Sequence, residues 1–221
     1  MRRARQRPNT PVRRVPERGA PLKIPGLGHL PKRRVGLLGG SFNPAHEGHL
    51  HVSREALKRL GLDEIWWLVA PQNPLKATAG MGKLAERIAG AKAAAKHDKR
   101  IRVLDLETRL GTHFTADTLA TLQRRWPRID FVWLMGADNL SQIRHWKDWQ
   151  RIFARVPIAV FARPTYCQKA LAELAAQRFS RARVIRETQR FSEIEPPAWM
   201  FLPVKLDFHS ATAIRAPKGA V

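Results

Sequence analysis

Two glycines and two histidines lie close together just after an apolar run in the first quarter of the chain. The stretch GLLGGSFNPAHEGHLH occupies positions 36–51 and includes Gly39, Gly40, His46 and His49. Small residues let backbone N–H groups approach an anion closely, and the start of a helix adds its positive dipole. The spacing matches neither G-x-G-x-x-G nor G-x-x-x-x-G-K-[ST]. The glycines therefore indicate either a phosphate loop of another kind or a tight turn between a strand and a helix.

The two histidines are three residues apart, which on the first turn of a helix puts them on one face, directed back toward the glycine loop. A zinc helix of the H-E-x-x-H type needs histidines four apart, whereas the letters here are HEGH, with His51 as a conceivable third ligand. A transition-metal site and a purely structural pair are two alternatives. The third, which we favour, is that both imidazoles donate hydrogen bonds to the phosphates of a nucleoside triphosphate.

The elements that must position these residues alternate along the chain. Short apolar runs typical of strands are separated by longer stretches with helical periodicity. We predict strands at 34–39, 64–70, 100–107, 129–136 and 156–163, with a weaker one at 182–186, and helices at 47–62, 83–97, 115–126, 146–155 and 167–179.

The predicted strands are apolar throughout, which indicates burial on both faces and therefore a parallel sheet covered by crossover helices. The expected fold is a single doubly wound (Rossmann-like) α/β domain, with a parallel sheet of five to six strands flanked by helices. Ligands of such folds bind beyond the carboxyl ends of the strands. The stretch PQNPLKATAGMGK at 71–83 follows the second strand and is predicted to be a loop at that edge.

The composition bounds the class of protein. The chain has 221 residues, 44% of them hydrophobic, and one cysteine, Cys167, which excludes an internal disulfide and fits a reducing compartment. No apolar run approaches the roughly 18 to 20 residues of a membrane span. We therefore expect a cytoplasmic protein that does not associate with a membrane.

The net charge of +22 is concentrated at the amino terminus, where residues 1–34 hold eleven Lys or Arg and one acidic residue. This stretch also has six prolines and no aromatic residue, so we expect residues 1–33 to be a disordered basic extension and 34–221 to be the folded domain. The extension is interpreted as a solvated tail, with a weak polyanion-binding arm and a targeting segment as alternatives. Nucleic acid is accordingly not an expected partner, except weakly through this arm.

The stretch GGSFNPAHEGH resembles the [T/H]-x-G-H signature of the nucleotidyltransferase superfamily, in the form found in bacterial nicotinate-mononucleotide adenylyltransferases. Further stretches resemble other motifs of that family, in the family's order: APQNPLK at 70–76, THFTADTL at 112–119, MGADNLSQIRHWKDW at 135–149 and HSATAIR at 209–215. The resemblance implies transfer of AMP from ATP to nicotinate mononucleotide, giving nicotinate adenine dinucleotide and pyrophosphate in NAD biosynthesis, with Mg²⁺ held mainly by the phosphates and no metal-ligating side chains.

For ATP, the resemblance implies two catalytic histidines: His49 stabilises the α-phosphate and His46 binds the triphosphate beside it. The other ATP-binding residues that it implies are Gly39, Gly40, Ser41, Phe42, Ser210, Thr212 and Arg215. Arg163 is a further candidate for phosphate contact.

For the mononucleotide, the resemblance implies that Trp146 stacks on the pyridine ring, and that Thr115 and the backbone amides of Ala116 and Lys147 hold the carboxylate. Asp138 would bind ribose hydroxyls and Lys76 the phosphate. Trp66 and Trp67, which lie inside a predicted strand, are assigned to packing.

Two alternatives stay open. A related nucleotidyltransferase could use nicotinamide mononucleotide or phosphopantetheine as acceptor, although Trp146 and the HFTADT loop disfavour phosphopantetheine. A function of another class is a nucleic-acid-binding protein that uses the basic arm, but aromatic residues are not interleaved with the charges of that arm.

Overall fold

The computed structural model describes residues 32–71, 80–162 and 167–204. Its six strands are β1 (Arg33–Gly40), β2 (Glu64–Val69), β3 (Ile101–Leu104), β4 (Ile129–Gly136), β5 (Ile158–Phe161) and β6 (Trp199–Leu202). The helices are α1 (Glu47–Arg59), α2 (Leu84–Ala95), α3 (Leu106–Leu110), α4 (Thr115–Arg125), α5 (Ala137–Gln142), α6 (Trp149–Phe153), α7 (Cys167–Ala172) and α8 (Leu174–Arg178), with a 3₁₀ turn, η1 (Ile143–His145), after α5.

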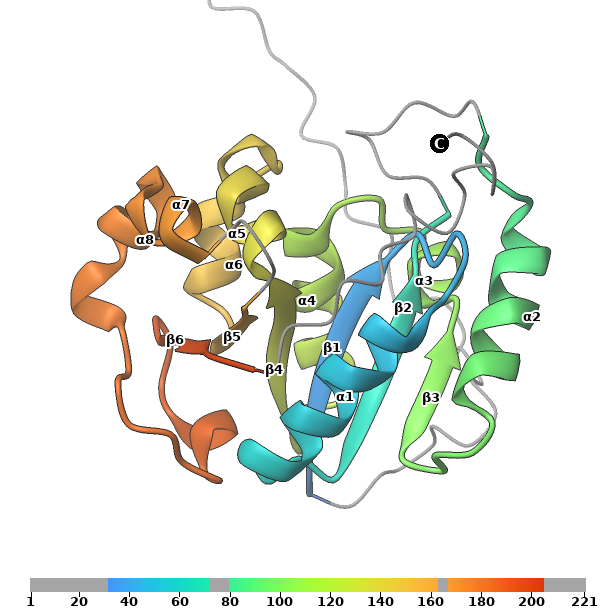
Figure 1. The fold of residues 1–221 in the computed structure, drawn as a ribbon, viewed down its shortest axis with the longest axis horizontal. Coiled ribbons are helices and arrows are strands. Elements are labelled where there is room, and N and C mark those ends of the chain that lie inside the picture. The colour runs from blue at the N-terminus through green and yellow to red at the C-terminus, as the bar shows by residue number, and fades with distance from the viewer. Residues whose placement is uncertain (1–31, 72–79, 163–166, 205–221) are drawn as a thin grey trace, which may run out of the picture.

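All strands pair in parallel in one sheet with the order β3-β2-β1-β4-β5-β6 (Figure 1). One buried cluster joins one face of the sheet to α1 and α2, and a second joins the opposite face to α4, α5, α6 and α8. Helices on both faces of a parallel sheet confirm the predicted doubly wound α/β fold, with six strands.

The last strand was predicted at the wrong place. Residues 182–186 contribute one isolated bridge, between Arg183 and Trp199, and the sixth strand is Trp199–Leu202. Ile185 is 90% exposed, so the earlier run does not bury its apolar side chain, whereas Trp199 and Leu202 are buried beside β5. Burial therefore favours the later run, which is only four residues long and follows Pro196 and Pro197.

Several helix boundaries also differ from the prediction. The predicted helix at 146–155 covers only Trp149–Phe153, because Trp146 is extended and Asp148 has a φ of 52°. The helix at 167–179 divides into α7 and α8, where Glu173 is extended. The short helices α3 and α5 were not predicted.

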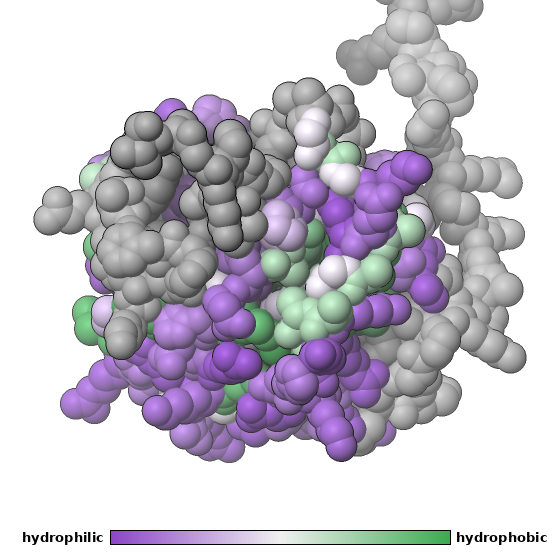
Figure 2. All heavy atoms as spheres, turned by 45° about the vertical axis from the view of Figure 1, so that its right-hand side comes forward, coloured by the Kyte–Doolittle hydropathy of each residue, from purple (hydrophilic) through white to green (hydrophobic). Residues whose placement is uncertain are grey.

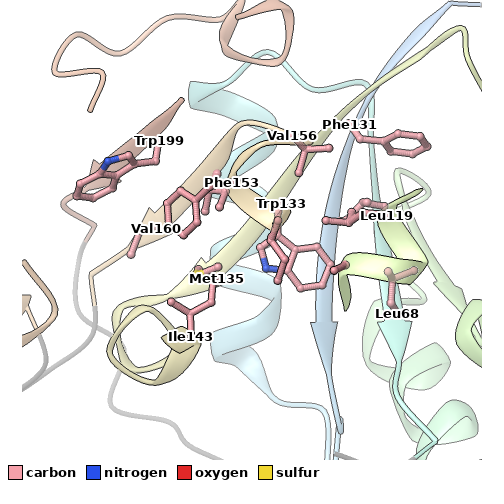
Figure 3. Close-up of a cluster of buried hydrophobic side chains, with 14 of the residues drawn as sticks. Leu68, Leu119, Phe131, Trp133, Met135, Ile143, Phe153, Val156, Val160 and Trp199 are labelled. Carbon is pink, nitrogen blue, oxygen red and sulfur yellow. The ribbon is translucent and has the colours of Figure 1, made fainter. Parts of the chain in front are cut away.

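Trp133 of β4 fills the middle of the cluster that contains α4, together with Leu119 and Met135 (Figure 3). Its indole lies against the backbone of Gly39 on the neighbouring strand. A Cβ atom added at Gly39 would lie 2.6 Å from Cη2 of Trp133, closer than such contacts allow. At Gly40 the nearest atom would be Cε2 of Phe42, at 3.4 Å, an ordinary contact.

Gly39→Ala is therefore expected to destabilise the protein by about 1–3 kcal/mol, because the indole must move within a packed core. Gly40→Ala is the matched control and should lower the free energy of unfolding by less. Urea unfolding of both variants measures the difference. Equal unfolding midpoints for the two variants would show that the indole does not require a glycine at position 39.

In the view that brings α2 forward, hydrophilic side chains surround a pale-green band of weakly hydrophobic residues (Figure 2). Within the described part of the chain, no helix combines the length and the apolar character that crossing a bilayer requires.

Candidate active site

The strands β1 and β4 are neighbours at the centre of the sheet, and the chain leaves them toward opposite faces. After β1 it enters α1, which packs on one face through Leu50 and Ala56, and after β4 it enters α5, which packs on the other through Leu140. This is the topological switch point of the sheet, the place beyond the carboxyl ends of the strands where doubly wound folds bind their ligands. The glycine loop and Asp138, in the first turn of α5, both lie at this edge.

His46 and His49 form a reciprocal cap at the start of α1. His46 is the N-cap residue, and its Nδ1 accepts a hydrogen bond from the Gly48 N–H at 3.1 Å. The His46 N–H in turn donates to Nδ1 of His49 at 3.2 Å, and the two ring centroids are 4.0 Å apart. The two imidazoles therefore lie side by side, as their spacing of three residues predicts.

This cap determines the tautomer of both rings. A neutral imidazole has one N–H and one acceptor nitrogen, and in each ring Nδ1 is the acceptor. The proton of each neutral ring is therefore carried on Nε2, the nitrogen farther from the backbone. His46 is buried and His49 is half-buried. Two Nε2–H donors side by side at a helix amino terminus are suited to binding an anion.

Phe42 holds His49 in position through a contact between their rings. Its backbone has a φ of 47°, which is rare for a bulky residue, and its ring is 1% exposed. The ring centroid lies 4.6 Å from that of His49 and 5.0 Å from that of Trp67. Packing against these two rings holds the loop in a conformation that would otherwise be strained.

Trp67 packs as predicted, fully buried like Trp66, but it also supports the site. Its indole N–H donates to Oγ of Ser53 at 2.8 Å, and the Ser53 hydroxyl donates to the carbonyl of His49 at 2.8 Å. A chain of hydrogen bonds thus connects the core strand β2 to the helix turn that carries His49.

Arg87 is the main residue of this region that the sequence did not identify. It lies on α2, is only 4% exposed, and donates hydrogen bonds to four backbone carbonyls. Burial lowers the pKa of its guanidinium below the usual value. A signal was present: Arg87, Ala91 and Ala95 are four residues apart and form the buried face of α2, and an arginine is unusual on such a face.

The residues predicted to hold the carboxylate of the mononucleotide come from two segments that the structure brings together. Thr115 is the first residue of α4, and Lys147 lies in the segment between η1 and α6. The Lys147 ammonium lies 4.4 Å from the ring centroid of Phe114 and 4.0 Å from Oδ2 of Asp117. The start of α4, with Thr115 and Ala116, therefore lies beside Lys147, as the predicted carboxylate site requires.

Trp146 is half-buried, and its ring meets that of Trp133 edge to face with centroids 6.4 Å apart. The partial exposure of a large aromatic ring at the carboxyl edge of the sheet suits stacking on a flat ligand. Trp133 therefore lies between Trp146, which is predicted to stack on the pyridine ring, and the backbone of Gly39 at the end of β1.

Five predicted residues, Lys76, Arg163, Ser210, Thr212 and Arg215, lie outside the described residues. Across 32–71, 80–162 and 167–204, no group of three or more His, Cys, Asp or Glu side chains is placed to hold a metal ion.

Glu107 is a second residue that the sequence did not single out. It lies in α3, directly after β3, and burial raises the pKa of its carboxyl group from 4.5 to about 7. Between these two values the folded chain retains a proton that the unfolded chain releases, so this group makes stability fall as pH rises.

We expect Glu107→Gln to be more stable than the wild type at pH 8, by about 1–3 kcal/mol, and to differ little near pH 5. The glutamine keeps the shape of the protonated acid and cannot ionise. Urea unfolding at the two pH values measures this difference. Parallel stability profiles for the two proteins would contradict the burial of the carboxylate.

Comparisons with known proteins agree on one family. The chain matches the cytidylyltransferase-like family over residues 37–216. A probable nicotinate-nucleotide adenylyltransferase of Parvibaculum lavamentivorans is 51% identical over 199 residues, covering 90% of this chain and 96% of that protein. Another, of Ruegeria pomeroyi, is 48% identical over 190 residues, covering 86% of this chain and 88% of that protein.

Among solved structures, the nicotinic acid mononucleotide adenylyltransferase of Plasmodium falciparum complexed with NaAD has a TM-score of 0.62. The match covers 83% of this chain and 82% of that chain at 18% sequence identity, a level at which the likeness shows the fold alone. The family match and the two bacterial relatives confirm the family that the motifs predicted. The chain belongs to the cytidylyltransferase-like family and, within it, to the nicotinate-nucleotide adenylyltransferases.

Proposed function

We propose that this chain transfers AMP from ATP to nicotinate mononucleotide and releases pyrophosphate. The observation that carries the proposal is the His46–His49 pair, in which both rings have Nδ1 engaged by the backbone and so carry the proton on Nε2 at the amino terminus of α1. This geometry suits a triphosphate, because the donors are fixed before charge develops on the reacting phosphorus.

The reaction is an in-line displacement without a covalent enzyme intermediate. An oxygen of the mononucleotide phosphate forms a bond to the α-phosphorus of ATP, and the bond from that phosphorus to the bridging oxygen of the β-phosphate breaks. Two anions must meet, so positioning and charge neutralisation dominate the catalysis. His49 would stabilise the α-phosphate and His46 the neighbouring phosphates.

The loop after β1 would provide the wall of the ATP site. Gly39 and Gly40 end the strand, and Ser41 and Phe42 begin the turn that leads to His46. Small residues at the strand end let the nucleotide approach the backbone. Ser210, Thr212 and Arg215, implied by the family resemblance, would contact the phosphates from the far end of the chain.

Magnesium is expected to enter with ATP. The ion would be held mainly by phosphate oxygens and water, as Mg²⁺ prefers. Bound there, it would neutralise charge on the departing pyrophosphate.

The acceptor site would lie between the start of α4 and the segment before α6. Trp146 would stack on the pyridine ring, and Thr115 with the backbone amides of Ala116 and Lys147 would bind the carboxylate. Asp138 would bind ribose hydroxyls and Lys76 the phosphate. The contacts of Lys147 with Phe114 and Asp117 support this arrangement, because they hold the two segments together.

Pyrophosphate release tests the proposal. Purified protein with ATP and Mg²⁺ is offered nicotinate mononucleotide or phosphopantetheine, and a reaction without acceptor gives the background. We expect release with the mononucleotide only. Release with phosphopantetheine alone would assign the chain to another acceptor, and no release above background with either would contradict nucleotidyl transfer to both.

A further inference from the structure

Resting on the proposed function, we propose that Arg87 is a positioning residue for the transfer reaction. Together with Asn43 it forms a clamp that holds the loop after β1 against both described ends of the connection between β2 and α2. The clamp sets the backbone of the nucleotide loop relative to the second strand end without itself touching substrate.

The first observation in favour of this role is that an arginine occupies a buried position where an apolar residue would pack. Arg87 shares the buried face of α2 with Ala91 and Ala95, and within the described ranges no carboxylate forms an ion pair with it. Burying a cation without a counter-ion is costly, and here only carbonyl dipoles compensate. A side chain needed merely to cover the sheet would not carry this cost.

The second observation is the location of the carbonyl groups that accept hydrogen bonds from Arg87. Nη1 of Arg87 donates to the carbonyls of Ser41 at 2.6 Å and Ala70 at 2.8 Å, and Nη2 donates to that of Pro71 at 2.8 Å. Nε donates to the carbonyl of Gly82 at 2.9 Å. One rigid, planar group therefore joins the ends of two neighbouring strands to the segment before α2.

The bond to Ser41 also orients an amide of the nucleotide loop. In a trans peptide the C=O and the following N–H point in opposite directions, so the Phe42 N–H is directed away from Arg87. Phe42 has a φ of 47°, a conformation that needs outside support. Arg87 supports this conformation through its hydrogen bond to the Ser41 carbonyl, and the packing of the Phe42 ring supports it through the side chain.

Asn43 completes the clamp from the loop itself. Its Nδ2 donates to the carbonyl of Gly80 at 3.0 Å, and its Oδ1 accepts from the Gly82 N–H at 3.2 Å. Pro71 and Gly80, which flank residues 72–79, are thus held by Arg87 and Asn43 respectively. A hollow of about 160 Å³ borders Asn43, Arg87 and Gly82, so water can enter beside these residues if the guanidinium is removed. The variants below are therefore expected to fold.

The test compares Arg87→Met and Arg87→Lys with a matched control, Arg102→Met. Arg102 is also partly buried, but it donates to Glu64 at 2.8 Å at the amino-terminal end of β2, away from the site. We expect Arg87→Met to lower kcat/KM for ATP and nicotinate mononucleotide tenfold or more, mainly through kcat, as small misplacements of reacting groups do. Arg87→Lys should recover part of this loss, and Arg102→Met should reduce only stability.

Amide hydrogen exchange tests the clamp independently of activity. In Arg87→Met, exchange at Gly82 and Ala70, whose N–H groups donate to Asn43 and to the Gly40 carbonyl, should speed up while that of the β1 amides stays unchanged. Wild-type kcat in Arg87→Met, or unchanged exchange at both amides, would overturn the inference. An inactive wild-type protein would contradict the proposed function instead, and the exchange measurement would then decide the clamp alone.

Discussion

Replacing His49 by alanine is expected to lower kcat for pyrophosphate release by roughly two to three orders of magnitude, the usual cost of removing one preorganised transition-state donor. The imidazole is held ready for this role, since its Nδ1 accepts from the His46 N–H and its ring lies 4.6 Å from that of Phe42, centroid to centroid. The effect should fall on kcat, because the charge that His49 would stabilise grows during the reaction.

Alanine at position 49 also removes one half of the helix cap, so stability must be separated from catalysis. His49→Gln is the sharper variant, because glutamine at this position of a helix can accept from the N-cap N–H and preserve the cap. It should unfold near the wild-type temperature and still lose most of kcat. His51→Ala, two residues further along α1, is the matched control and should remain active. A wild-type rate in His49→Gln would remove His49 from the mechanism.

Replacing Trp146 by alanine is expected to lower kcat/KM for nicotinate mononucleotide by about 30- to 100-fold, which corresponds to the loss of one aromatic stacking platform. The ring is half-buried and braced edge to face by Trp133, so it offers a fixed surface to a flat ligand. The KM for ATP should change much less, because Trp146 belongs to the proposed acceptor site. Steady-state kinetics with each substrate varied in turn separates the two effects.

Two variants control this result. Trp146→Phe keeps an aromatic face and should retain most of the activity. Trp149→Ala removes another half-buried indole, which packs edge to face on Phe153 and Phe179, and should lower stability without changing the KM for the mononucleotide. If Trp149→Ala and Trp146→Ala raised the KM for the mononucleotide equally, the effect of Trp146→Ala would be structural and would not show a contact between Trp146 and the pyridine ring.

The parts of the fold that the sequence predicted are those where local pattern and burial agree. β1 and β4 are long runs buried on both faces, and their predicted bounds differ from the structure by at most one residue at either end. The failures occur where burial depends on distant partners. Ile185 and Trp199 both belong to short apolar runs, and only the position of β5 decides which run joins the sheet.

In the candidate site, too, the features set by local sequence were predicted, whereas those set by contacts between distant segments were not. The histidine pair follows from a spacing of three residues at the start of a helix, a local rule. The four carbonyls around Arg87 come from segments up to 46 residues away, and no local pattern encodes that convergence. Likewise, the sequence could name Thr115 and Lys147, but the contacts of Lys147 with Phe114 and Asp117 depend on how α4 packs beside the segment after η1.

The identity of the acceptor is the central claim, and a side-by-side measurement of kcat/KM for nicotinate and nicotinamide mononucleotide, with ATP and Mg²⁺ in excess, tests it most directly. A carboxylate that accepts charge-assisted hydrogen bonds from the start of α4 and from Lys147 should favour the nicotinate form by about tenfold or more. We predict that preference. Equal or better turnover of nicotinamide mononucleotide would contradict the proposed carboxylate site.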